Sequence, residues 1–478
     1  MRLFLERSGL WIKPFQSAGE FYIYSAWNNV IHRVSSRLYR YFADDHESGG
    51  RDRQRQTAIS LGLAPAGDVP LEVFPAAAIR DGFAGLQRNG PVRLVITVTE
   101  ACNYRCRYCM FSGAYPFERR HGRRTMPVET AIRALLWYFH FPRKTYSIQF
   151  YGGEPLLERE RIAHLVEEAL KRAPPGARLR FGLTTNGSLL DDEAIAFMVE
   201  HDFDLAISLD GPAPVHNRYR RTRDGRPTYG QVWKRIRRIK ALYPDYFASR
   251  VSFLMTLAPP FRIPELTGFW LRHEDVFAGK LPGLQILKDE PQSLYEALGP
   301  GADRKDIDLT QLRERYLARV IQGAVPDGLS RAACELSMKT LARRQMTSPA
   351  TLAISAGQCV PGIRCHVTPD GGLHMCERAT SCLPIGHVDT GFDQHRVEAL
   401  LVRFREIILE RCRDCWAVRL CRRCIVDFAA GPVLSAENLS ALCAGRRRDL
   451  ERDLADYCRA RSRNDHCFDS LLTDEPDS

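Results

Sequence analysis

The 478-residue sequence has no apolar run that approaches the roughly 20 residues of a membrane-spanning helix. Its first residues, MRLFLERSGLWIKPF, also lack a sustained apolar segment followed by small residues, the pattern of a secretory signal. We therefore expect a cytoplasmic protein with no membrane partner. In a reducing compartment, clusters among its fifteen cysteines are expected to mean metal binding or catalysis more often than disulfides.

The sequence also lacks an aromatic and basic module of the kind that binds RNA, although its net charge is +11. We therefore expect no nucleic-acid partner. The charge can be a solvated basic surface, or it can offset anionic groups inside the protein. Arginines crowd the C-terminal cysteines in ERCRDCWAVRLCRRC, where they could offset anionic clusters; they are Arg411, Arg413, Arg419, Arg422 and Arg423.

The middle of the chain alternates between strand and helix patterns. Strands are predicted at 92–99, 146–153, 179–187, 203–211, 250–258 and 283–287, and helices in the PVETAIRALLWYFHF segment and at 156–172, 190–201, 229–243 and 263–274. About six βα units predict an α/β fold with a curled, partial (β/α)6 barrel resembling a TIM barrel. In such folds the functional groups gather at the C-terminal ends of the strands.

Three cysteines, Cys102, Cys106 and Cys109, follow the first predicted strand within eight residues. A disulfide uses two thiols, and a closed zinc or iron–sulfur site usually uses four. Three thiolates can hold three irons of a four-iron cluster and leave the fourth iron open to a small ligand; an incomplete zinc knuckle is the alternative. The spacing after a strand that opens a parallel barrel resembles that of the radical S-adenosylmethionine (SAM) superfamily.

This resemblance implies a [4Fe–4S] cluster whose open iron binds SAM, and an electron donor such as flavodoxin or ferredoxin. One-electron reduction would release a deoxyadenosyl radical that abstracts hydrogen from a C–H bond. The sequence YGGEP resembles the family's amino-group clamp, whose residues here are Gly152, Gly153, Glu154 and Pro155. The resemblance implies that the two glycines let backbone carbonyls approach SAM and that the Glu154 carboxylate suits the ammonium group of SAM. A chance Gly-Gly turn is the alternative.

Two further segments belong to the same resemblance. SLDGP and HNRYR resemble the downstream segment, which implies that Ser208 and Arg220 contact the ribose hydroxyls or the carboxylate of SAM. Tyr108 is expected to pack against the adenine of SAM. The alternative is that Tyr108 is an ordinary aromatic residue of the loop, with no contact to SAM. TTNG at 184–187 is more generic and could be a strand-ending turn.

A second group of cysteines lies near the C-terminus and resembles the SPASM extension of radical SAM proteins, which binds two auxiliary four-iron clusters. The resemblance implies one cluster on Cys359, Cys365, Cys376 and Cys424, and another on Cys412, Cys415, Cys421 and Cys443. The last CxxC pair has two intervening residues where the family often has three. Two CxxC pairs can also mean structural zinc, but three further cysteines would then be unexplained. Cys334, Cys382, Cys458 and Cys467 match nothing and are expected to be ordinary thiols.

The resemblance covers residues 92 to 450 and divides the chain into parts. We expect an N-terminal α+β extension at 1–90, a radical SAM barrel at 91–295, a helical bridge at 296–350, a SPASM domain at 351–450, and a helical end with an acidic tail at 451–478. The extension reads as strand, Asn-Asn turn, strand and helix, and resembles the start of modules that bind the leader of a precursor peptide; a docking extension is the alternative.

SPASM proteins mostly modify ribosomally made peptides (RiPPs) or proteins, so the resemblance implies a peptide maturase with a leader-bearing substrate. A sulfatase-maturing enzyme, which oxidises Cys or Ser to formylglycine, is the alternative within the family. Those enzymes carry Asp after the cysteine that corresponds to Cys376, where this chain has Glu377, a candidate catalytic base. An RNA-modifying radical SAM enzyme and a non-enzymatic zinc scaffold are alternatives from other classes.

Overall fold

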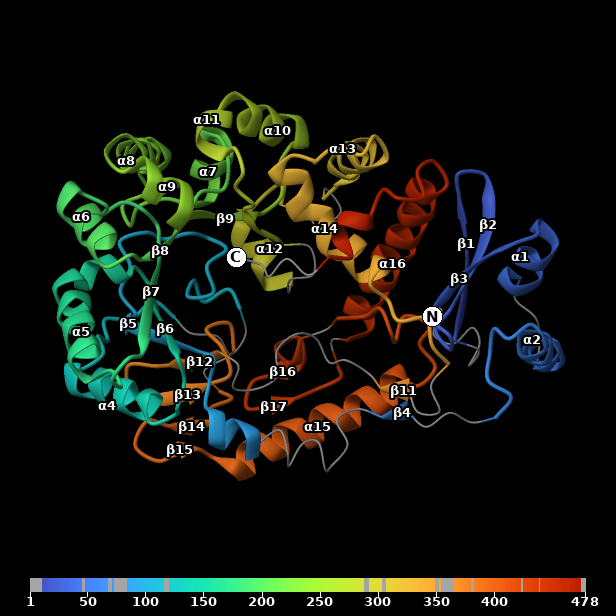
Figure 1. Ribbon diagram of the computed structural model, residues 1–478, viewed down its shortest axis with the longest axis horizontal. Helices are drawn as coiled ribbons and strands as arrows, with labels where there is room; N and C mark the ends of the chain where they lie inside the picture. Colours follow the sequence, from blue (N-terminus) through green and yellow to red (C-terminus); the bar gives the residue numbers. More distant parts are fainter. Residues whose placement is uncertain are drawn as a thin grey trace.

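The structure is a computed structural model that describes residues 11–44, 48–67, 71–72, 84–115, 120–287, 292–302, 307–348, 352–353, 364–379, 382–422, 424–437 and 439–473. The barrel (cyan to yellow-green) lies at one end of the elongated molecule and the N-terminal sheet (blue) at the other (Figure 1). C-terminal segments (orange and red) connect the two. Within the described ranges, no helix has both the length and the apolar character that crossing a membrane requires.

A sheet of ten strands forms the centre of the barrel, in the order β10-β9-β8-β7-β6-β5-β12-β13-β14-β15. Its first six strands are all parallel, which confirms the predicted partial (β/α)6 barrel. They are β5 (Arg93–Thr99), β6 (Thr145–Gly152), β7 (Arg178–Thr185), β8 (Asp204–Ser208), β9 (Val251–Leu257) and β10 (Gly283–Ile286).

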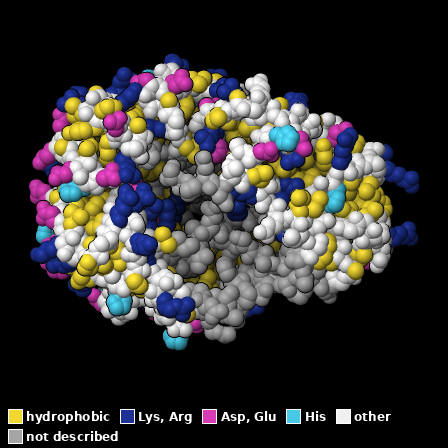
Figure 2. Space-filling view, viewed as in Figure 1, with side chains coloured by type: hydrophobic (Ala, Val, Ile, Leu, Met, Phe, Trp, Pro, Cys, Tyr) yellow, Lys and Arg dark blue, Asp and Glu magenta, His cyan; other side chains and the backbone are white. Residues whose placement is uncertain are grey.

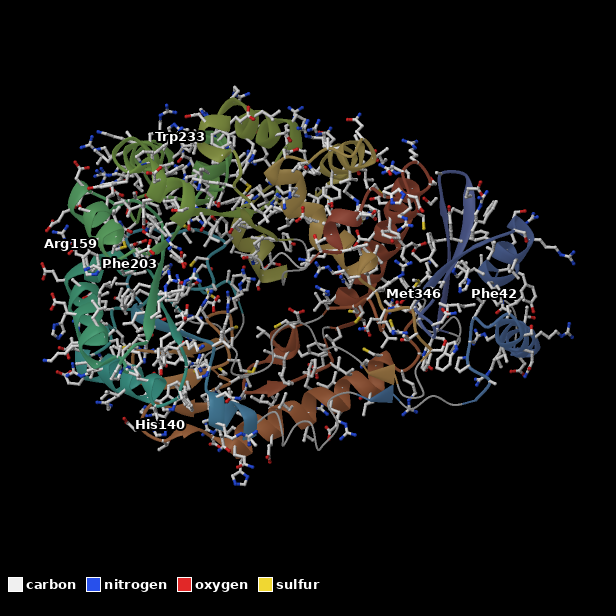
Figure 3. The ribbon with its side chains drawn as sticks, viewed as in Figure 1. Phe42, His140, Arg159, Phe203, Trp233 and Met346 are labelled. Atoms are coloured by element: carbon white, nitrogen blue, oxygen red, sulfur yellow. The ribbon has the colours of Figure 1, made fainter. Side chains whose placement is uncertain are left out.

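Helices between these strands cover the outer face of the sheet (Figure 1). They are α4 (Val128–Phe139), α5 (Arg159–Arg172), α6 (Asp192–Glu200), α7 (Ala213–Tyr219), α8 (Tyr229–Leu242), α9 (Pro244–Arg250), α10 (Ile263–Arg272) and α11 (Glu274–Phe277). Alternate strand residues face these helices and form the core. Phe203, which lies inside the barrel wall (Figure 3), stacks on Phe150 and Phe181 with centroids 6.1 and 5.5 Å apart.

The opposite, concave face of the sheet is polar, because the remaining alternate residues point there. Across four neighbouring strands, the register places Arg364, Arg93, Ser147 and Arg180 side by side. Arg378 Nη2, which follows β13, donates to Gln285 Oε1 on β10 at 3.3 Å. The two sides of the curled sheet therefore approach each other.

The cysteine-rich C-terminal segment continues the barrel sheet. β12 (Arg364–Val367) pairs in parallel with β5, and it forms an antiparallel hairpin with β13 (Gly372–His374) around Gly371, whose φ is +89°. The next strands, β14 (Gly386–His387) and β15 (Gly391–Phe392), extend the sheet. α15 (Gln394–Cys412), with its N-terminus capped by Asp393, and α16 (Leu439–Arg461) complete this region.

The N-terminal part forms its own antiparallel sheet, β1 (Ile12–Ser17), β2 (Glu20–Ser25) and β3 (Val30–Val34), followed by α1 (Ser36–Ala43) and α2 (Ser48–Ser60). The predicted strand, turn, strand and helix are therefore confirmed, with β1 as an additional strand. This sheet packs against α16, and α13 (Thr310–Ile321) and α14 (Gly328–Ala342) share the same apolar cluster.

Candidate active site around the three-cysteine loop

The loop that carries Cys102, Cys106 and Cys109 begins directly after β5, at the C-terminal end of the strand. The Gly152–Glu154 turn after β6 is held against it, since Gly153 N donates to Thr99 O at 2.9 Å and Glu154 N to Ala101 O at 2.8 Å. A Cβ on Gly152 would lie 2.2 Å from Thr99 O, and one on Gly153 would lie 2.2 Å from Ala101 O. Only glycines allow this close approach of the two loops.

Glu154 has no exposed surface and accepts three hydrogen bonds. The donors are the Thr185 hydroxyl and the Asn186 backbone N–H, each at 2.7 Å, and the Leu156 backbone N–H at 3.1 Å. Burial raises the pKa of this carboxyl to about 7. Glu154 thus joins the ends of β6 and β7, and its expected contact with the ammonium group of SAM remains a prediction.

The TTNG turn after β7 also holds the cysteine loop. Asn186 Nδ2 donates to Asn103 Oδ1 at 2.9 Å and lies 4.0 Å from Cys102 Sγ. Asn103 Nδ2 in turn donates to Ser188 Oγ at 2.9 Å. The segment that sequence reasoning treated as generic therefore helps to fix the residue next to the first cysteine.

The three thiols lie in a setting that suits a metal cluster. Burial raises the pKa of Cys102 and of Cys106 to about 12, so both would stay protonated at neutral pH unless bound metal supplied positive charge. Backbone N–H groups of Tyr104 and Phe111 point at the sulfurs of Cys102 and Cys109, each at 3.4 Å. Three soft donors with N–H support fit a four-iron cluster that keeps one iron open.

A buried ion pair lies beside the second cysteine. Arg220 Nε donates to Asp210 Oδ2 at 2.9 Å, and its Nη1 lies 3.9 Å from Cys106 Sγ. The Tyr108 hydroxyl donates to the same Asp210 oxygen, and the Arg220 guanidinium lies 5.5 Å from the Tyr108 ring centroid. Ser208, the last residue of β8, is 8% exposed. The structure therefore brings Tyr108 and Arg220 together with the cysteine loop.

Sequence reasoning gave no role to Asp210, Asn103 or Asn186, although they hold the predicted residues in place. Asp210 lies two residues after the end of β8 and accepts hydrogen bonds from Tyr108 and Arg220 as well as from the Thr256 backbone N–H at 3.0 Å. The available signal was position, because both Asp210 and Asn186 stand where a parallel strand ends.

Among the C-terminal cysteines, one predicted set is brought together. Burial raises the pKa of Cys412, and the thiols of Cys415, Cys421 and Cys443 raise it further, because they lie within electrostatic reach of the Cys412 thiol. In the other set, the β12–β13 hairpin brings Cys365 and Cys376 to one end, while Cys424 is half-buried and Cys359 lies outside the described residues. Of the cysteines assigned no role, Cys334, Cys458 and Cys467 are buried in an apolar cluster.

In the described ranges, no group of three or more His, Cys, Asp or Glu side chains is arranged to hold a single metal ion. A four-iron cluster differs from a single ion because each thiolate binds its own iron, which spreads the sulfurs apart. Neither auxiliary cluster is established by this geometry, and both remain predictions.

Glu377, the candidate base, lies one residue after Cys376. Its Oε1 accepts a hydrogen bond from Arg364 Nη1 at 3.1 Å, and its side chain is 17% exposed. Arg364 stands next to Arg93 in the concave face, so the carboxylate lies on the barrel side of the hairpin. Its catalytic role stays a prediction.

Residues 96–261 match the model of the Radical SAM superfamily. The match includes the three cysteines of the loop, the Gly152–Glu154 turn, Asp210 and Arg220. All of these lie in the barrel, and most stand at or just beyond the C-terminal ends of its strands.

Two curated relatives each match about a third of this chain. A serine-type anaerobic sulfatase-maturating enzyme of Bacteroides thetaiotaomicron is 26% identical over 150 residues, 31% of this chain and 36% of that protein. The radical SAM cyclopropyl synthase TigE of Paramaledivibacter caminithermalis is 24% identical over 155 residues, 30% of this chain and 32% of that protein. The matches thus span about a third of each relative's own length.

A solved structure, native anSMEcpe with bound AdoMet, aligns with 80% of this chain and 100% of its own chain. The TM-score is 0.58 at 19% sequence identity. At that identity the likeness establishes a shared fold.

Proposed function

Because the chain carries a radical SAM domain in residues 96–261, we propose that it is an enzyme that installs a post-translational modification in a ribosomally made peptide. A [4Fe–4S] cluster and SAM, when bound, supply hydrogen-atom abstraction from an unactivated C–H bond. The modification is a thioether, a carbon–carbon crosslink or a related oxidation. The observation that carries the proposal is the loop of three partly buried thiols, held against the Gly-Gly turn at the C-terminal ends of parallel strands.

The residues around this loop have distinct tasks in the proposal. Cys102, Cys106 and Cys109 bind the cluster, and the backbone of Gly152, Gly153 and Pro155 receives the amino group of SAM. Arg220 is held in place by Asp210, which leaves its outer nitrogen for the SAM carboxylate, and Ser208 faces the ribose. Tyr108 closes the adenine side, its hydroxyl fixed on Asp210.

Three features support a peptide as the substrate: the names of the curated relatives, the N-terminal sheet and the C-terminal cysteine sets. The curated relatives are named as maturating enzymes for sulfatases and as a cyclopropyl synthase. The N-terminal sheet has β3 at its edge, where an extended leader peptide could add a strand. The two C-terminal cysteine sets would hold auxiliary clusters that accept an electron from the substrate or bind its thiolate, which gives a total of roughly twelve irons for three clusters.

A sulfatase-type maturase is the second candidate, because relatives with that name match part of this chain. Glu377 follows Cys376 where those enzymes carry Asp, and this departure weighs against the second candidate although a carboxylate is kept. In that reaction a Cys or Ser side chain becomes formylglycine, an aldehyde. A peptide with a sulfatase Cys motif and a Cys-rich precursor peptide distinguish the two candidates. An aldehyde-reactive probe labels the formylglycine product of the sulfatase peptide, whereas a crosslinked precursor peptide stays unlabelled.

The test of the proposed site is the combined change of Cys102, Cys106 and Cys109 to Ala. After anaerobic reconstitution, this variant should lose about four irons and all deoxyadenosine formation with SAM and dithionite, because these three thiols are the ones proposed to hold the cluster that binds SAM. A Cys334→Ala variant, changed at a buried thiol remote from the loop, is the control and should keep both. If the triple variant still cleaves SAM, the assignment of the open-iron site is wrong.

A further inference from the structure

Arginine is concentrated in a segment that is hydrogen-bonded to the cysteine loop. Residues 216–227, HNRYRRTRDGRP, contain five arginines and one acidic residue, Asp224. Of these arginines, Arg220 is buried against Asp210, and the other four are exposed; they are Arg218, Arg221, Arg223 and Arg226. The half-buried Arg105 and the exposed Arg107 belong to the cysteine loop itself.

Residues 220–227 of this segment, here called the arginine hairpin, are hydrogen-bonded directly to the cysteine loop. Arg105 N donates to Arg221 O at 2.8 Å, and Arg223 N donates to Asn103 O at 3.1 Å. Arg107 N donates to Tyr219 O at 3.1 Å, just before the hairpin. A partner that touches the exposed side of the hairpin would therefore be separated from the cysteines by little more than one layer of backbone.

Most of the positive charge of residues 216–227 is not neutralised by the ion pair and hydrogen bonds that these arginines form. Arg226 forms an ion pair with Asp224 at 2.5 Å, whereas the Nη1 atoms of Arg218 and Arg221 donate to backbone carbonyls of Pro260 and Gly225. Figure 2 shows Lys and Arg side chains gathered beside the central hollow, on the side where Figure 1 draws the barrel. An exposed field of one sign attracts partners of the opposite sign and speeds their encounter.

We propose that the arginine hairpin is the docking surface for an acidic electron-transfer protein of the flavodoxin class, a proposal that rests on the proposed function. The carrier loses one electron, and the cluster bound by Cys102, Cys106 and Cys109 gains it. The geometry favours this partner because the charged hairpin is hydrogen-bonded to the loop that carries the thiols that need the electron. Electron-transfer complexes are small and transient, so a few exposed arginines suffice without an apolar core.

A second basic surface in the barrel offers a matched control. α8 carries Lys234, Arg235, Arg237, Arg238 and Lys240, and these line an open cavity together with Asp192 and Asp275. Arg238 pairs with Asp192 at 2.6 Å and Lys240 with Asp275 at 3.0 Å. No backbone hydrogen bond links the described residues of α8 to those of the cysteine loop.

The experiment compares the reconstituted holoenzyme with two double variants of equal charge change. The test variant is Arg221→Glu with Arg223→Glu, and the control is Lys234→Glu with Arg237→Glu. Binding of an oxidised, acidic flavodoxin is measured by calorimetry at low salt. Deoxyadenosine formation is measured twice, once with reduced flavodoxin and once with dithionite, which needs no docking surface.

In the test variant we expect flavodoxin binding and the flavodoxin-driven rate to fall by about tenfold or more, while the dithionite-driven rate stays within about twofold. The control should match the wild type in all three measurements. Added salt should weaken wild-type binding, because screening acts on exposed charges.

Several outcomes would overturn the proposal. An unchanged flavodoxin-driven rate would remove the surface from electron delivery, and a loss in the α8 control alone would move docking to α8. An equal fall with dithionite would mean that the hairpin only supports the cysteine loop. Normal deoxyadenosine rates with reduced modification of an acidic peptide would make the hairpin a substrate surface. A wild type that cleaves no SAM with dithionite contradicts the proposed function instead, and flavodoxin binding still tests the hairpin.

Discussion

Glu154 combines full burial with three accepted hydrogen bonds at the junction of two strand ends. Each of its oxygens faces a backbone N–H, from Leu156 on one side and Asn186 on the other. Whichever way an amide is turned at this position, its NH2 group faces a donor. A buried donor without an acceptor costs about 1–3 kcal/mol.

We therefore expect Glu154→Gln to lower the free energy of unfolding of the iron-free protein by about 1–3 kcal/mol. Burial raises the pKa of Glu154 to about 7 from its ordinary 4.5. The stabilisation that the wild-type Glu154 side chain contributes is therefore complete below about pH 4.5, and it is lost as pH rises through about 7. The difference between variant and wild type should thus be larger near about pH 5 than near about pH 8. Urea denaturation at both pH values measures it.

Glu193→Gln, at a carboxylate whose side chain is 80% exposed, is the matched control and should change stability little. A Glu154→Gln protein as stable as the wild type would mean that this carboxylate does not hold the two loops together.

Single residues were predictable where chemistry alone selects them. Cys102, Cys106 and Cys109 stand out by spacing, and Gly152 and Gly153 by their place after a strand. Asp210 and Asn186 could not be assigned a task, because the side chains that they hold are far away in sequence: Tyr108 lies 102 residues from Asp210, and Asn103 lies 83 from Asn186. Only the fold supplies those partners.

At the scale of elements, arginine side chains lie next to one another across neighbouring strands on the concave face of the sheet. Arg93 on β5 has Arg364 of β12 as its direct neighbour, and Arg180 of β7 lies two strands away on the other side. Glu377 pairs with Arg364 at 3.1 Å and Asp204 with Arg180 at 3.1 Å. Burial and the neighbouring Arg364 lower the pKa of Arg93, because the charged guanidinium is less stable at this position than in water.

We expect Arg93→Gln to leave the fold intact and to raise the free energy of unfolding by about 0.2–1 kcal/mol, because like charges directly opposite in a sheet destabilise it. Thermal unfolding of the reconstituted protein measures the change. Arg178→Gln, at the exposed first residue of β7, is the control and should have little effect. A clear loss of stability for Arg93→Gln would show that the guanidinium makes favourable contacts that outweigh the repulsion.

Element order along the barrel was predictable because strand and helix periodicities alternate regularly between residues 92 and 287. The continuation of the sheet by β12 was not, because β12 pairs with a strand more than 260 residues earlier and is only four residues long. Short strands carry too little pattern for a sequence to reveal their partner.

At the scale of the whole molecule, the N-terminal sheet rests on the C-terminal cysteine loop. The Trp11 indole donates to Arg413 O at 2.5 Å, and Arg419 Nη1 donates to Trp27 O at 3.1 Å. Trp416 packs against Tyr24 edge to face with centroids 6.3 Å apart, and the Lys13 ammonium lies 5.9 Å from the centroid of the Trp416 ring. Each of these contacts involves a residue between Cys412 and Cys421.

This arrangement predicts that metal bound by the Cys412 set stabilises the N-terminal sheet as well as its own loop. Metal binding supplies folding energy to the segment that carries the ligands, and Arg413, Trp416 and Arg419 lie within that segment. Without the metal, the loop would be free to shift, and the contacts of Trp11 and Arg419 would be lost. Two lost hydrogen bonds are worth about 1–3 kcal/mol, enough to speed local opening by about tenfold.

We therefore expect Cys412→Ala with Cys415→Ala to lower the iron content by about four and to raise amide hydrogen exchange in β1 and β2 by about tenfold, measured by mass spectrometry. The triple Ala variant at Cys102, Cys106 and Cys109 is the control: it also loses iron, but its loop contacts the barrel, so exchange in β1 and β2 should not change. Equal exchange in all three proteins would mean that the N-terminal sheet is held by α16 alone, through contacts such as Ser17 Oγ to Ala455 O at 2.5 Å. Faster exchange in the double variant alone would link cluster loading at the C-terminal loop to the sheet proposed to receive the leader peptide.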